Sequence, residues 1–64
     1  MEILRIIEHN YSIVYVNNNE KYNIYKRFSE DKWEILDREQ WKNFEDTTEL
    51  EELYNKRING NGNE

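Results

Sequence analysis

Hydrophobic and polar residues alternate through much of the first half of the chain, as they do in strands that bury one face. The alternation is clearest over residues 11–16 and 21–28, where β-branched and aromatic side chains predominate. Residues 1–9 are also read as a strand, although their isoleucines show the i, i+4 spacing of a short helix as well. Together with residues 33–35, these segments predict an antiparallel meander joined by tight, Asn-rich turns.

The pattern changes after Asp37, where the two-residue period of strands gives way to a helical one. Trp41 and Phe44 are three residues apart, which places both on one face of a helix. Asp37 can accept a hydrogen bond as the N-cap, and Gln40 occupies the third helical position of a capping box. These features predict a helix over residues 38–45.

A second helical pattern runs over residues 49–58, and its apolar stripe consists of Leu50, Leu53, Tyr54 and Ile58. Thr48 and Glu51 have the spacing of a capping box at its start. The apolar positions change phase between the two helical patterns, so we predict two helices or one kinked helix. Residues 59–64 are rich in Asn and Gly, and we expect them to form a disordered tail after a single domain of residues 1–58.

The predicted fold class is therefore α+β: a small antiparallel sheet of three to four strands, covered on one face by one or two C-terminal helices. Trp33 and Trp41 flank the change from strand to helix. Because an indole can bury a large apolar area, both are expected in the core between the sheet and the helices.

Composition argues against catalysis. The absence of cysteine excludes disulfides and cysteine-based zinc sites, and a single histidine, His9, leaves other transition metals without their usual ligands. His9 is interpreted as a solvated turn residue. Both glycines lie in the C-terminal segment, so no glycine-rich loop is placed to bind phosphate. We therefore expect no catalytic, cofactor-binding or metal-binding residues, and a protein that is not an enzyme.

Charge divides the chain into two unequal halves. Residues 1–29 carry four bases and three acids, residues 30–64 carry five bases and eleven acids, and the net charge is −5. Carboxylates spaced over one surface can dock on a basic groove and imitate the phosphates of a nucleic acid. The candidate partner-binding residues are acids displayed by the turns and helices of the second half: Glu30, Asp31, Glu34, Glu39, Glu45, Asp46, Glu49 and Glu52.

This charge distribution favours a non-enzymatic protein–protein interaction module. The concrete expectation is a small acidic inhibitor, encoded by a phage or mobile element, that acts as a DNA mimic against host defence. Its acidic face would block a basic, nucleic-acid-binding site on a host protein in the cytoplasm. The sequence contains no stretch of about 18 apolar residues that would span a membrane, and its N-terminus lacks the pattern of a signal peptide.

Two alternatives remain open. Residues 21–28 interleave bases with aromatic side chains, the combination that single-strand nucleic-acid binders use for stacking and phosphate neutralisation. In that strand, Tyr25 and Arg27 share the outer, nucleic-acid-binding face, and the core face is assigned to Tyr22, Ile24 and Phe28. The acidic second half makes direct nucleic-acid binding less favourable, because it repels phosphate. The other alternative is a structural subunit that forms a homodimer through an exposed sheet edge.

Overall fold

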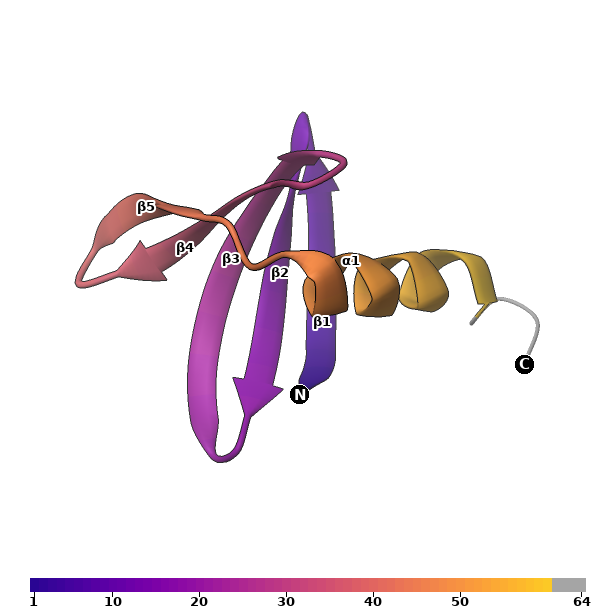
Figure 1. Cartoon of the computed structure of the whole chain (residues 1–64), viewed down its shortest axis with the longest axis horizontal. Helices are drawn as coiled ribbons and strands as arrows, with labels where there is room; N and C mark the ends of the chain where they lie inside the picture. Colours follow the sequence, from indigo (N-terminus) through magenta and orange to yellow (C-terminus); the bar gives the residue numbers. More distant parts are fainter. Residues whose placement is uncertain (61–64) are drawn as a thin grey trace.

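A computed structural model describes residues 1–60, which form five antiparallel strands followed by a helix (Figure 1). The strands are β1 (Glu2–His9), β2 (Tyr11–Asn18), β3 (Lys21–Ser29), β4 (Lys32–Asp37) and β5 (Gln40–Phe44). Each pairs with its neighbour in the sequence, so the sheet order is β1-β2-β3-β4-β5. The helix α1 (Thr48–Asn55) continues into a wider π-type segment, η1 (Lys56–Gly60). The predicted α+β class, with an antiparallel meander and a C-terminal helix, is confirmed, but the sheet has five strands and not the predicted three to four.

The first two hairpins close through residues in the left-handed backbone conformation. Asn19 and Glu20, between β2 and β3, have φ angles of 52° and 68°, as both central residues of a type I′ turn require. Asn10, with φ of 67°, joins β1 to β2. Asparagine visits this region more readily than most residues, because its short polar side chain can hydrogen-bond to the local backbone. The Asn-rich segments thus form the tight turns that the sequence predicted.

Residues 38–45 form a turn and a strand instead of the predicted helix. Arg38 and Glu39 have φ angles of 52° and 66° and close a two-residue turn. β5 then runs back along β4 and stays paired with it over its whole length. Asp37 and Gln40, whose spacing imitates a capping box, face each other as the first pair of this ladder. Strand pairing therefore outweighs the local capping signal, and a single helix follows the sheet.

The same hairpin sends its two aromatic residues to opposite sides of the sheet, because successive side chains of a strand alternate. Phe44 packs against Tyr25, with 5.1 Å between the ring centroids. Trp41 instead lies on the other side, where its ring centroid is 4.3 Å from the ammonium of Lys26. Of the two indoles predicted to lie in the core, Trp33 is 1% exposed and Trp41 is only half-buried. The prediction was correct for Trp33 and wrong for Trp41.

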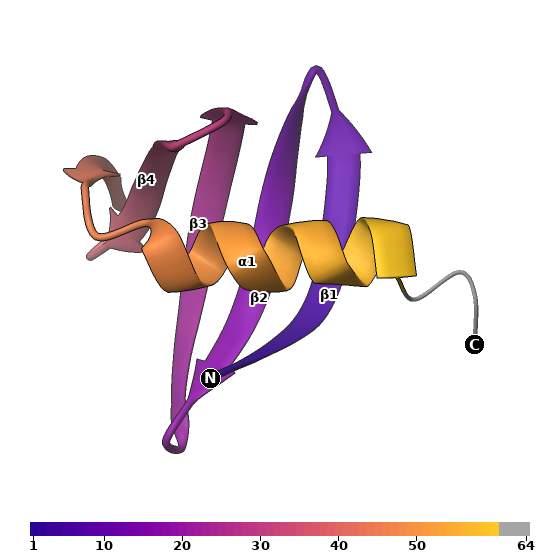
Figure 2. The same cartoon turned by 45° about the vertical axis from the view of Figure 1, so that its right-hand side comes forward.

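α1 lies across one side of the sheet and crosses β1, β2 and β3 (Figure 2). We call this side the covered face, and its core consists of Ile3, Val14, Val16, Tyr25, Trp33, Leu50 and Tyr54. Leu50 and Tyr54 provide the buried side of the helix, as predicted, whereas Ile58 is 46% exposed. The helical segment extends through Gly60. The rest of the predicted tail, residues 61–64, lies outside the described residues.

The opposite side of the sheet, the open face, is covered by no element among residues 1–60 (Figures 1 and 2). Strand register and alternation assign to it the apolar and aromatic residues Ile7, Tyr11, Ile13, Tyr15, Tyr22, Ile24, Phe28, Leu36 and Trp41, together with the polar residues Glu2, Arg5, His9, Asn17, Lys26, Lys32, Glu34 and Asn43. The predicted faces of β3 are therefore reversed. Tyr25 is in the core, while Tyr22 and Phe28 are 74% and 50% exposed. Because β3 has apolar residues on both sides, alternation alone does not say which side the helix covers.

Candidate functional site

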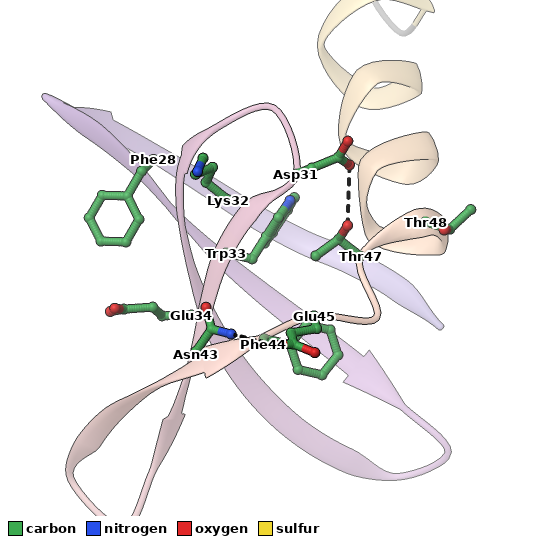
Figure 3. Close-up of a pocket in the computed structure, with 10 residues that line it drawn as sticks. All are labelled: Phe28, Asp31, Lys32, Trp33, Glu34, Asn43, Phe44, Glu45, Thr47 and Thr48. Atoms are coloured by element: carbon green, nitrogen blue, oxygen red, sulfur yellow. Dashed lines mark hydrogen bonds between the residues drawn. The ribbon is translucent and has the colours of Figure 1, made fainter.

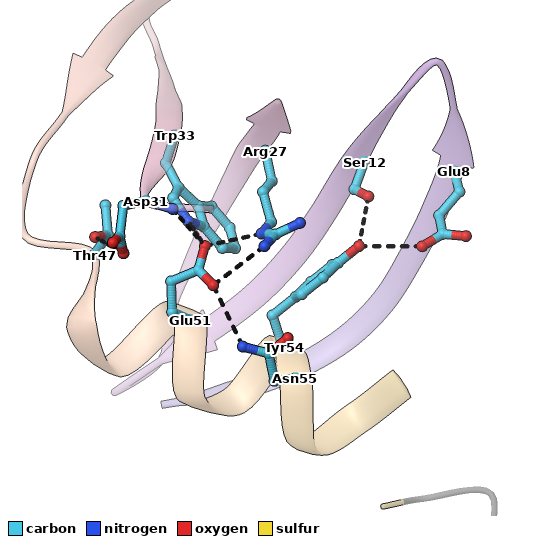
Figure 4. Close-up of polar contacts among 9 residues, drawn as sticks. All are labelled: Glu8, Ser12, Arg27, Asp31, Trp33, Thr47, Glu51, Tyr54 and Asn55. Carbon is cyan, nitrogen blue, oxygen red and sulfur yellow. Dashed lines mark hydrogen bonds and ion pairs between the residues drawn. The ribbon is translucent and has the colours of Figure 1, made fainter. Parts of the chain in front are cut away.

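Glu51 is the centre of a polar network that fixes α1 on the covered face (Figure 4). Its carboxylate accepts hydrogen bonds from Arg27 Nε at 2.9 Å, Arg27 Nη2 at 3.2 Å and Trp33 Nε1 at 2.7 Å. The backbone N–H of Asp31 donates at 2.9 Å, and Asn55 Nδ2 donates at 3.4 Å. Five donors, from two strands, a turn and the helix itself, therefore converge on one buried side chain.

This environment keeps Glu51 ionised. Burial by itself raises the pKa of a carboxyl group, but the hydrogen bonds from Arg27, Asp31 and Trp33 and the charge of Arg27 together lower the pKa of Glu51 to about 2. The same hydrogen bond to Glu51 raises the pKa of Arg27. A carboxylate already surrounded by five donors has little capacity left for a substrate. We therefore interpret the network as structural.

The predicted capping box does not form. The N-cap of α1 is Thr47, and no side chain caps the helix there. Glu51, the expected partner of Thr48, turns inward to the sheet instead. The sequence signal for this network was the basic residue Arg27 on a strand with apolar neighbours, but nothing in the sequence identifies which acid would pair with it.

A second group of contacts ties the later turns of the helix to β1 and β2. The hydroxyl of Tyr54 lies 2.8 Å from Ser12 Oγ and donates to Glu8 Oε2 at 3.1 Å. The guanidinium of Arg27 lies 4.3 Å from the centre of the Tyr54 ring. From η1, Arg57 donates to two backbone carbonyls beside the bulge of β1, at 2.7 and 3.4 Å. These bonds position the helix along its whole length.

Tyr25 and Arg27 are the residues that the sequence proposed for nucleic-acid contact, and both lie on the covered face. Tyr25 is 3% exposed, and its burial raises the pKa of its hydroxyl group. Arg27 is held by the Glu51 carboxylate and by the Tyr54 ring. These two side chains are therefore not available to a nucleic acid, which is a correction to that assignment.

The structure brings five of the eight predicted acidic residues to one corner of the molecule. The turn between β3 and β4 meets the segment that leads into α1, where Thr47 Oγ1 donates to Asp31 Oδ1 at 3.2 Å. Two acids come from that turn and three from the segment and the first helical turn. We call this group the acidic corner: Glu30, Asp31, Glu45, Asp46 and Glu49.

The other three predicted residues are placed elsewhere. Glu34 lies on the open face, opposite Lys26 of β3 and Asn43 of β5. Glu39 occupies the turn between β4 and β5, and Glu52 is exposed on α1. Because Glu34 and Glu52 are on opposite sides of the sheet, the eight residues do not share a single face.

An open depression of about 570 Å³ lies beside the acidic corner (Figure 3). The residues that line it include three acids, Asp31, Glu34 and Glu45, and two phenylalanines, Phe28 and Phe44. Lys32 is the one basic residue among the residues that line it. The sequence contains no signal for this depression, because residues 38–45 are predicted to form a helix and not the strand β5.

On the open face, Lys26 is surrounded by aromatic rings. Its ammonium lies 4.3 Å from the ring centroid of Trp41, 4.7 Å from that of Tyr11 and 5.8 Å from that of Phe28. Tyr11 and Phe28 also contact each other, at 5.9 Å. Each such cation–π contact contributes about 0.5–1 kcal/mol at an exposed site. The open face therefore has an aromatic cluster around Lys26 that no part of residues 1–60 covers.

Within residues 1–60, no group of three or more His, Cys, Asp and Glu side chains is arranged to hold a metal ion. No helix in the described part of the chain has the length and apolar character needed to cross a membrane. No family model matches the sequence, and comparisons with curated proteins and with solved structures gave no match.

Proposed function

We propose that this protein is a non-enzymatic module that binds another protein, and that its acidic corner receives a basic side chain of the partner. The observation that carries the proposal is the depression beside the corner, whose lining includes three acidic and two aromatic residues. An arginine or lysine needs both kinds of residue, because its apolar stem packs on a ring while its charged head meets carboxylates.

The geometry of the corner supports this role. The backbone N–H of Asp31 is bonded to Glu51, and its carboxylate accepts from Thr47, so its position is fixed before a partner arrives. Glu45 likewise accepts a hydrogen bond from Asn43, at 3.2 Å. Carboxylates that are already positioned lose less conformational entropy when they bind.

The proposed partner carries an exposed Arg or Lys within a basic surface. Proteins that act on nucleic acids have such surfaces, since they neutralise phosphates with the same side chains. By occupying that surface, the acidic corner would exclude the nucleic acid, as an inhibitor that mimics DNA does. Its long-range charge would chiefly accelerate encounter with the basic partner.

A peptide titration tests the proposal directly. We expect a tetra-arginine peptide, added to the ¹⁵N-labelled protein, to shift the amide resonances of Asp31, Glu45 and Thr47 before others. The double variant Asp31→Asn/Glu45→Gln should weaken binding at least tenfold. Asparagine suits position 31, where φ is 62°, because it tolerates the left-handed region and can still accept from Thr47.

The matched control is Glu2→Gln/Glu20→Gln, which removes the same charge from outside the corner. Equal loss of affinity in both double variants would show only diffuse charge attraction and would overturn the assignment to the corner. Binding that does not weaken between 50 and 300 mM salt would contradict the electrostatic basis of the proposal.

A second candidate function, single-strand nucleic-acid binding, is favoured by a different observation. Lys26 with Tyr11, Phe28 and Trp41 is a basic–aromatic cluster on an uncovered sheet. These are different residues from the Tyr25 and Arg27 expected from the sequence. Fluorescence anisotropy with labelled oligo-dT and oligo-U tests this candidate. If it is correct, the protein binds these oligonucleotides, and the affinity falls when Lys26 is replaced by Gln and when salt is added.

A further inference from the structure

We infer that the open face binds a second copy of this chain, so that two sheets pack face to face in a symmetric dimer. This inference goes beyond the proposed basic-partner site and does not depend on it. It begins from the exposed apolar surface: Ile7 and Tyr11 are each 38% exposed, Phe28 is 50% and Tyr22 is 74% exposed. Soluble monomers rarely expose contiguous apolar patches larger than a few hundred Å².

The size of the open face suits a dimer interface. The five strands are five to nine residues long. At about 3.3 Å per residue and about 4.8 Å between strands, the sheet has a plane area of roughly 600 Å². The accessible area is larger, because side chains project from this plane. Standard protein–protein interfaces bury about 800 Å² on each partner. Two sheets that pack face to face, about 10 Å apart, cover each other's inner side chains in the same way as the halves of a β-sandwich.

Charge decides in favour of a second copy over other occupants. Strand register and alternation place three bases and two acids on the open face, a net charge of +1: Glu2, Arg5, Lys26, Lys32 and Glu34. The other residues of the described chain carry six bases and eleven acids, a net charge of −5. Two open faces can therefore meet without strong repulsion, while the acidic surfaces point away from each other.

A nucleic acid fits this face less well. Only three cations are present, and the ammonium of Lys26 is already held by three rings. The nearly balanced charge also gives a strongly basic protein little to pair with on this face. An interface between two copies requires no excess of positive or negative charge on the open face. A two-fold axis places this face against the same face of the second copy.

Sedimentation equilibrium on the full chain tests the inference. We expect a mass of twice 8.0 kDa at tens of micromolar protein, with dissociation on dilution. The variant Ile7→Glu adds a carboxylate to the open face and should raise the dissociation constant at least thirtyfold. The matched control, Ile58→Glu, has the same composition and net charge, and it changes a residue of similar exposure on η1. It should dimerise like the parent.

A second readout covers the case in which Ile7→Glu fails to fold. Acrylamide quenching of tryptophan fluorescence in the parent should fall as the protein concentration rises, because Trp41 lies on the open face. Trp33 is already buried at every concentration, so it does not contribute to the change. Circular dichroism reports on the folding of each variant.

Three results would overturn the inference. The first is a parent that stays monomeric up to about 1 mM. The second is a dimer that Ile7→Glu and Ile58→Glu weaken equally, which would indicate contact through a sheet edge or the helix. The third is a monomer that binds oligo-dT and loses this binding in Ile7→Glu, which would assign the face to nucleic acid. Asp31→Asn/Glu45→Gln should leave the dimer intact, so this test is separate from that of the acidic corner.

Discussion

The two faces of the sheet hold aromatic side chains in quite different settings. On the covered face, Trp33 and Tyr54 pack edge to face at 5.9 Å, and their polar atoms reach Glu51, Ser12 and Glu8. No buried side-chain nitrogen or oxygen among residues 1–60 lacks a hydrogen-bond partner. A polar network with every group satisfied specifies one position for the helix.

The open face is organised more loosely. Tyr11, Phe28 and Trp41 gather around the ammonium of Lys26, and their outer surfaces remain exposed or half-buried. Within residues 1–60, no element is held above these rings by a hydrogen bond. The comparison shows how one sheet can use its two sides differently: one side holds the helix, and the other is covered by no element of residues 1–60.

The largest expected effect is on stability, and it differs between the two tryptophans. Trp33→Ala should lower the free energy of unfolding by about 5 kcal/mol, because it opens a cavity in the core and removes a donor to Glu51. That is close to the entire stability of a small domain. Trp41→Ala should cost about 1–2 kcal/mol, since its ring is only half-buried. Urea denaturation at micromolar protein measures both, and equal losses would contradict the distinction between the faces.

The second prediction compares adjacent glutamates on α1. Glu51→Gln should cost about 3 kcal/mol, because it leaves the guanidinium of Arg27 buried without its counter-ion. Glu52→Gln, which changes an exposed neighbour in the same way, should stay within about 0.5 kcal/mol of the parent. Chemical denaturation of the pair is the measurement. A parent-like Glu51→Gln would mean that the helix is held by its apolar contacts and by the hydrogen bonds of Tyr54 and Arg57.

The covered face should also respond to acid. The pKa of Glu51 is about 2 in the folded protein, against an ordinary value of 4.5, so the folded state prefers the ionised form. This preference contributes roughly 3 kcal/mol above pH 4.5 and is lost as the pH falls from 4.5 to 2. Denaturation midpoints measured across that range should decline, and the decline should be much smaller in Glu51→Gln. A parallel decline in both proteins would assign the acid sensitivity to other carboxylates.

The smallest expected effect concerns two tyrosine hydroxyls. Tyr54→Phe should destabilise the protein by about 1–2 kcal/mol, because it removes the partner shared by Ser12 and Glu8. Tyr22→Phe removes a hydroxyl from a side chain that is 74% exposed on the open face, and it should be neutral. Thermal denaturation of the two variants side by side would reveal this difference, and a neutral Tyr54→Phe would show that water replaces the lost bonds.

Sequence reasoning identified the fold class and four of the five strands because their alternation and Asn-rich turns are local signals. It missed β5 for a physical reason. The turn before it uses Arg38 and Glu39 at positive φ, where glycine or asparagine is usual, so the turn has no recognisable composition. The spacing of Asp37 and Gln40 then imitated a helix start.

The candidate site was predictable only in part. The excess of acids in the second half is visible in the composition, but their grouping depends on the turn at Asp31 meeting Thr47, sixteen residues later. On the covered face of β3, Arg27 pairs with Glu51 across twenty-four residues, and Tyr25 packs in the core. Such pairings between distant residues have no periodic signature in a single sequence.

The order of elements along the chain has a consequence for how the protein forms. Every strand pairs with its immediate neighbour in sequence, so the whole sheet can zip up through short loop closures, which favours rapid folding. The helix, however, comes last, and Tyr54 and Arg57 reach back 46 and 54 residues to β1. During synthesis, the five strands leave the ribosome before the segment that shields Trp33. Until α1 docks, the nascent sheet is apolar on both sides, and this interval is when the chain is most exposed to aggregation.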